Sequence, residues 1–86
     1  MNQIAKRYVL FTTPFCPSCP AVKEYAKNLK LEGKVVDATD DYGSKQAIDF
    51  GVASVPTMIF FDEKDTEIGR AHNVSSIKSF LSDWNF

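Results

Sequence analysis

The sequence has little cysteine, little histidine and no long apolar run, and each shortage excludes a class of protein. Two cysteines and one histidine supply at most three of the four ligands that a structural zinc site takes, so such a site within one chain is not expected. No apolar run approaches the roughly 20 residues that cross a bilayer. Residues 1–7 lack the apolar core and cleavage site of a signal peptide. We therefore expect a cytosolic protein, in which structural disulfides are rare.

No excess of charge or of loop-forming residues is present either. Ten basic and eleven acidic residues are mixed along the chain and give a net charge of −1, so a nucleic-acid-binding face is not expected. Glycine and proline number four each, and 44% of the residues are hydrophobic, which is typical of a folded globular chain. The length predicts one domain over residues 1–86, and we expect a monomer with no membrane partner.

The spacing of apolar residues predicts the element order β-α-β-α-β-β-α. Strands are expected over 8–12, from Val35–Val36 to near Thr39, over 57–61 and over 66–69; helices are expected from about Cys19 to a stop at Gly33, through Ala47, Ile48 and Phe50 to Gly51, and from about Ser75. The last helix should bury Ile77, Phe80, Leu81 and Trp84.

This order predicts an α/β fold with one mixed sheet. A strand–helix–strand unit at the start implies a parallel pair with a right-handed crossover. The hairpin near the end adds an antiparallel edge. We therefore expect a four-stranded mixed sheet flanked by three helices, with helices on both faces.

The two cysteines form the motif Cys16-Pro17-Ser18-Cys19 between the first predicted strand and the first predicted helix. Free backbone N–H groups and the helix dipole at a helix N-terminus favour an anion, and a thiolate at Cys16 is such an anion. Thiolates are the attacking species in disulfide exchange. Cys16 is therefore the candidate nucleophile, and Cys19, one helical turn later, is the candidate resolving thiol.

Two prolines bear on where this helix begins. Pro17 suits the first turn of a helix, because the backbone N–H groups of that turn have no acceptor within the helix and the N–H that proline lacks is not needed. Pro20 would remove a hydrogen bond from a helix that began at Cys16, so a regular helix is expected only from about Cys19 or Pro20. Such a start would leave the amides of Ser18 and Cys19 free to face sulfur.

Two other interpretations of the cysteine pair stay open. A structural disulfide would close a very small loop in a protein expected to be cytosolic. One cysteine pair supplies only two thiolates, so a metal site would need further ligands or a second chain. A pair placed between a strand and a helix favours a redox motif.

Together with Ser54-Val55-Pro56-Thr57 before the third predicted strand, the cysteine motif resembles the thioredoxin/glutaredoxin superfamily over about Arg7–Trp84. The resemblance implies the thioredoxin fold and a cis Val55–Pro56 bond beside the nucleophile. It also implies that Val55 offers its backbone N–H and C=O to a bound peptide or to glutathione, while Pro56 shapes the floor of the site.

The sequence combines features of thioredoxins with features of glutaredoxins. Phe15 followed by Cys-Pro-Ser-Cys is closer to the Cys-Pro-Tyr-Cys of glutaredoxins than to the Trp-Cys-Gly-Pro-Cys of thioredoxins. Leu10 stands where thioredoxins carry a buried Asp, as expected for glutaredoxins. However, the segment 68–72 has one glycine and no acid, whereas glutaredoxins have a Gly-Gly pair and an acidic residue that help to hold glutathione. The hairpin 61–67 is similar to that of thioredoxins.

Beyond the two cysteines, the candidate substrate-binding residues are Phe15, Pro17, Ser18, Val55, Pro56, Gly69 and Arg70. An exposed aromatic at Phe15 would form a docking surface, and Arg70 would meet a carboxylate of glutathione or of a partner. Lys23 either stabilises a thiolate at Cys19 or is a solvated surface lysine. His72 is interpreted as a solvated loop residue, and Asp37, Asp40 and Asp41 as a solvated strand end and turn.

These observations predict a thiol–disulfide oxidoreductase that reduces protein disulfides through Cys16 and Cys19. No bound cofactor is required, because the electrons pass through sulfur; the external reductant is thioredoxin reductase or glutathione, and the weak glutathione motif favours the reductase. A glutathione-dependent glutaredoxin and a dedicated electron donor to an enzyme such as a ribonucleotide reductase are alternatives. A non-catalytic thiol module that binds metal or docks to a partner is an alternative of another class.

Overall fold

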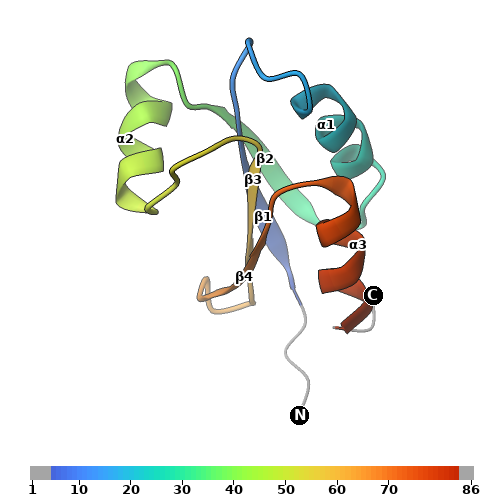
Figure 1. Ribbon diagram of the computed structural model, residues 1–86. Coiled ribbons are helices and arrows are strands. Elements are labelled where there is room, and N and C mark those ends of the chain that lie inside the picture. The colour runs from blue at the N-terminus through green and yellow to red at the C-terminus, as the bar shows by residue number, and fades with distance from the viewer. Residues whose placement is uncertain (1–4, 84–86) are drawn as a thin grey trace.

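The computed structural model describes residues 5–83, which form one mixed sheet with helices on both faces (Figure 1). The elements are β1 (Arg7–Thr12), α1 (Cys19–Lys27), β2 (Glu32–Asp37), α2 (Asp41–Asp49), β3 (Thr57–Phe61), β4 (Glu67–Ala71) and α3 (Val74–Asp83). Within this described part, no helix is long and apolar enough to cross a bilayer.

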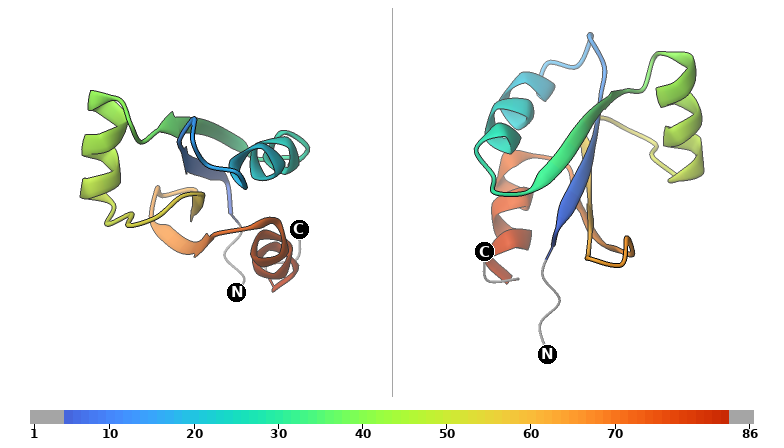
Figure 2. Two further views of the ribbon diagram at one scale, coloured as in Figure 1. Left: turned by 45° about the horizontal axis from the view of Figure 1, so that its top comes forward. Right: turned by 180° about the vertical axis from the view of Figure 1, so that it is seen from behind.

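The sheet has the strand order β2-β1-β3-β4. Strand β1 pairs in parallel with β2 and antiparallel with β3, and β3 pairs antiparallel with β4. Helices α1 and α3 cover one face, and α2 covers the other (Figures 1 and 2). The predicted element order, parallel first pair, antiparallel hairpin and two-sided helix cover are confirmed.

Strand β1 has a buried side chain on both faces. Tyr8 and Leu10 pack in the core beneath α1 and α3, whereas Val9 and Phe11 pack in the core beneath α2. Successive side chains on a strand point to opposite faces, so a strand covered on both sides reads as a continuous apolar run. This is the reason that residues 8–12 show no polar alternation.

Helix α1 ends earlier than predicted. The Asn28 N–H bonds to the Tyr25 carbonyl, three residues back, at 3.1 Å. The Asn28 side-chain amide also donates to the Glu24 carbonyl at 3.2 Å. These bonds close the last turn, and Gly33, the predicted stop, lies within β2 instead. Strand β4 also extends two residues beyond its predicted end at Gly69.

Helix α2 begins and ends close to the residues that mark its ends in the sequence. The Asp40 carboxylate accepts a hydrogen bond from the Gly43 N–H at 2.6 Å, which satisfies one of the free amides of the first turn. Gly51 follows the helix with a φ of 68°, a left-handed conformation that glycine adopts without a steric penalty.

Helix α3 packs as predicted over the part that the structure describes. Ile77 and Leu81 are buried, and the half-buried Phe80 ring stacks on Phe60 with ring centroids 4.5 Å apart. Trp84, which was also expected in the core, lies outside the described residues.

Gly43 leads to a prediction about stability. A Cβ at this position would overlap the carbonyl oxygen of Asp37 and press against Val36. Replacing glycine by alanine in an open helix stabilises it by about 1 kcal/mol. We expect Gly43→Ala instead to lower the free energy of unfolding by about 1–3 kcal/mol, because α2 must shift away from β2. Urea unfolding measures the change.

Lys45→Ala, at an exposed position of the same helix, is the matched control and should stay within about 0.5 kcal/mol of the wild type. A Gly43→Ala protein more stable than the wild type would contradict the close approach of α2 to β2.

Candidate redox site

The two cysteines are joined by a disulfide that links the cysteine loop (residues 13–18) to the start of α1. Their Cα atoms are 5.4 Å apart, which is within the usual range. Cys19 is 1% exposed, whereas Cys16 is partly exposed. A partner can therefore reach the Cys16 sulfur more readily, and this difference supports Cys16 as the nucleophile and Cys19 as the resolving thiol.

The start of α1 agrees only partly with the prediction. The helix begins at Cys19 with Pro20 in its first turn, where the missing N–H breaks no helical bond, so the predicted late start is confirmed. Pro17 lies ahead of the helix, not in its first turn. The Cys19 amide donates to the Cys16 carbonyl at 3.4 Å; the prediction that this amide is free to face sulfur is therefore wrong.

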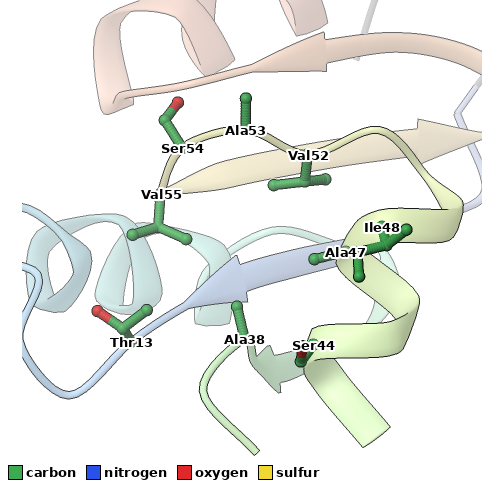
Figure 3. Close-up of a pocket in the computed structure, with 9 residues that line it drawn as sticks. All are labelled: Thr13, Ala38, Ser44, Ala47, Ile48, Val52, Ala53, Ser54 and Val55. Atoms are coloured by element: carbon green, nitrogen blue, oxygen red, sulfur yellow. The ribbon is translucent and has the colours of Figure 1, made fainter. Parts of the chain in front are cut away.

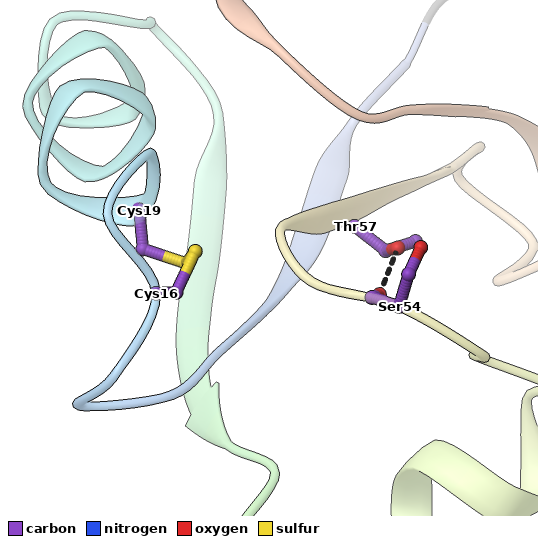
Figure 4. The surroundings of a disulfide bond; sticks show 4 residues. All are labelled: Cys16, Cys19, Ser54 and Thr57. Atoms are coloured by element: carbon purple, nitrogen blue, oxygen red, sulfur yellow. Dashed lines mark hydrogen bonds between the residues drawn. A yellow bond between two sulfur atoms is a disulfide. The ribbon is translucent and has the colours of Figure 1, made fainter.

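The second part of the site is the proline loop, residues 52–56, which leads into β3. Its Val55–Pro56 peptide bond is cis, as the family resemblance implied. The Thr57 hydroxyl donates to the Ser54 carbonyl at 2.7 Å, across the Val55–Pro56 unit. The disulfide points toward this loop (Figure 4). Substrate pairing with the Val55 backbone stays a prediction.

A hollow of about 310 Å³ lies between the proline loop, α2 and the start of the cysteine loop (Figure 3). Every residue that lines it is uncharged; they include Thr13, Ala47, Ile48, Val52, Ser54 and Val55. The Ile48 side chain is 76% exposed. Sequence analysis missed this hollow because it joins a loop and a helix that no motif connects.

The exposed residues around Cys16 include three of the predicted substrate contacts. Phe15 is 84% exposed, as a docking aromatic must be, and Pro17 and Ser18 are also exposed. This arrangement places an apolar ring and two small side chains beside the accessible sulfur.

Gly69 and Arg70 lie on β4 and have structural partners. A Cβ at Gly69 would overlap the Phe80 ring. The Arg70 guanidinium bonds to the Glu67 carboxylate, with Nε–O 2.6 Å, and to the Phe50 carbonyl just after α2. The hydrogen bond to Glu67 raises the pKa of Arg70. Substrate contact of Arg70 stays a prediction, and it would require the guanidinium to leave both partners.

The structure offers no carboxylate in place of the buried acid of thioredoxins within residues 5–83. Leu10 is fully buried at that position. Hydrogen bonds from the Thr39 hydroxyl (2.6 Å) and amide (2.8 Å) lower the pKa of Asp37, and the charge of Lys23 adds to this effect. A carboxylate with a lowered pKa is a weaker base. Asp37 and the helix-capping Asp40 therefore shape the turn, as predicted.

His72 has a bond that sequence analysis missed. Its side chain is exposed, as expected of a loop residue, yet Nδ1 lies 3.2 Å from the Thr57 hydroxyl oxygen. No local motif could reveal this contact, because it joins the ends of two strands.

Comparison with known proteins identifies the family. Residues 8–65, more than half of the chain, match the family model Glutaredoxin. The chain belongs to the thioredoxin/glutaredoxin superfamily. This redoxin is 32% identical over 81 residues to a thioredoxin of Rickettsia typhi, covering 86% of the chain and 72% of the relative. It is also 40% identical over 58 residues to a probable thioredoxin of Archaeoglobus fulgidus, covering 63% and 64%.

Solved structures agree with this assignment. The redoxin superposes on oxidised thioredoxin O2 from Arabidopsis thaliana with a TM-score of 0.74 at 20% identity, covering 92% of the chain and 74% of the neighbour. Thioredoxin 1 from Thermosipho africanus gives 0.65 at 25% identity, covering 93% and 99%. The thioredoxin fold is therefore confirmed, and with the Cys16–Cys19 disulfide the redoxin is a thiol–disulfide oxidoreductase.

The unequal exposure of the two sulfurs leads to a prediction about alkylation. In the reduced redoxin, iodoacetamide should modify Cys16 at least about tenfold faster than Cys19, because reactivity requires access as well as thiolate character. Mass spectrometry of the peptides at short reaction times measures both rates. In urea the two rates should converge, and equal rates in the folded protein would contradict the assigned roles.

Proposed function

We propose that this redoxin is a monomeric cytosolic protein-disulfide reductase that receives its electrons from a flavin-dependent thioredoxin reductase. The observation that carries the proposal is the unequal exposure of the two cysteines: Cys16, the chain neighbour of the exposed Phe15, is partly exposed, Cys19 is buried, and their disulfide points toward the proline loop. The uncharged hollow beside Val55 adds room for an extended segment of a protein. Protein substrates present such segments, whereas a small thiol does not need them.

The reaction is a pair of exchanges between sulfur atoms. The Cys16 thiolate attacks one sulfur of the substrate disulfide, forms a mixed disulfide and releases the other sulfur as a thiolate, which takes a proton from solvent. Cys19 then loses its proton and attacks the Cys16 sulfur. The substrate leaves with both sulfurs reduced, and two electrons have passed to it from the Cys16–Cys19 pair. The reductase returns two electrons to the resulting disulfide.

The surroundings of β4 support the reductase over glutathione. The predicted anchor for a glutathione carboxylate, Arg70, is held by Glu67 and the Phe50 carbonyl. In the sheet register, Arg70 on β4 lies opposite Ile59 on β3, and Ile59 belongs to the core beneath α2. Arg70 thus lies on the sheet face that α2 covers, opposite the face covered by α1, the helix that begins with Cys19.

A coupled assay tests the choice of substrate and donor. With NADPH and thioredoxin reductase, the wild type should reduce insulin, and Cys16→Ser should abolish the activity because the attacking sulfur is lost. Cys19→Ser should accumulate the mixed disulfide at Cys16. Activity on a glutathione mixed disulfide should be the weaker of the two.

The opposite ranking would identify a glutathione-dependent glutaredoxin. Activity only toward one enzyme, such as a ribonucleotide reductase, would identify a dedicated electron donor. No exchange activity at all, together with metal retained after purification under reducing conditions, would identify a metal-binding thiol module.

A further inference from the structure

We infer that His72 is a positioning residue that holds the proline loop in its substrate-binding shape through Thr57. This inference rests on the proposed function, because it concerns how the site binds a protein disulfide. His72 follows β4 directly, and Thr57 is the first residue of β3. Ala71 pairs with Met58 in the antiparallel β3–β4 hairpin. The residue after Ala71, His72, therefore lies opposite the residue before Met58, Thr57.

The number of protons in this cluster decides the direction of each hydrogen bond. The Thr57 hydroxyl carries one proton and lies 2.7 Å from the Ser54 carbonyl, which can only accept. The hydroxyl therefore donates to Ser54 and must accept at its other contact, the His72 Nδ1 at 3.2 Å. Nδ1 must then carry a proton. The neutral His72 ring is consequently the Nδ1–H tautomer, with Nε2 unprotonated.

The backbone around His72 is anchored by hydrogen bonds to the start of α3. The N–H groups of His72 and Asn73 both donate to the Ser76 hydroxyl, at 2.9 and 3.0 Å. The Ser76 N–H donates in return to the Asn73 side chain at 2.7 Å, a reciprocal cap at the start of α3. The ring thus connects the anchored N-terminus of α3 to the proline loop.

Removing the ring would act on the loop and not on the cysteines. Thr57 is 1% exposed, so its hydroxyl oxygen has little water to replace His72 as a donor. The Ser54–Thr57 bond frames the Val55–Pro56 unit. Without His72, the buried Thr57 hydroxyl keeps its bond to Ser54 but loses one of the two hydrogen bonds that fix its position. The loop must then be ordered when the substrate binds, and this ordering weakens binding.

Three substitutions at one position test the role. An asparagine amide places an N–H close to the position of Nδ1, whereas a glutamine amide reaches the position of Nε2. In the insulin assay, His72→Ala and His72→Gln should raise KM roughly twofold to tenfold, the effect of losing one hydrogen bond, with kcat within about twofold. His72→Asn should restore KM. Thr57→Val should raise KM similarly, and adding His72→Ala to it should have no further effect.

A second readout does not depend on catalysis. The ¹⁵N shifts of the neutral His72 ring should show the proton on Nδ1 in the wild type, and this preference should disappear in Thr57→Val. A proton on Nε2, or an unchanged KM in His72→Ala while the wild type reduces insulin, would overturn the inference. If the wild type fails to reduce insulin, the proposed function fails, and the ring tautomer alone decides whether His72 holds the loop.

Discussion

Strand β1 is hydrogen-bonded along both edges and buried on both faces, and the site depends on where this strand ends. Its last residue, Thr12, leads directly into the cysteine loop and accepts a hydrogen bond from the Ala38 amide at 2.8 Å. On its other edge, Phe11 pairs with Thr57 at the start of β3. Antiparallel pairing of the two most buried strands therefore brings the cysteine loop and the proline loop to the same end of the sheet.

The fold could be predicted because its central strands are continuous apolar runs, which are typical of strands covered on both faces. The end of α1 could not be predicted in the same way. Leu29 and Leu31 still pack against the core after the helix has ended, so the apolar spacing continues although the hydrogen bonding changes at Asn28. The spacing of apolar residues predicts which side chains face the core, but it does not predict which carbonyl accepts a hydrogen bond from each backbone amide.

The cysteine pair and the cis bond could be predicted because each lies within a short motif. The surroundings of Arg70 and His72 could not, because they depend on the register of the β3–β4 hairpin. That register is irregular between Phe60 and Phe61. A shift of one residue moves every side chain of a strand to the opposite face, and sequence alone does not reveal such an irregularity. The hollow beside Val55 could not be predicted for a different reason: only tertiary packing brings α2 against that loop.

The burial of Cys19 has a consequence for the order of encounters in a catalytic cycle. A disulfide sheltered at one sulfur is open to attack from outside only at the other, here Cys16. The reductant and the disulfide substrate must therefore both react at Cys16, and they cannot be bound there at the same time. Turnover of a thiol–disulfide oxidoreductase then alternates between reaction with the substrate and reaction with the reductant. Both must also fit beside the exposed side chain of Phe15, the residue before Cys16.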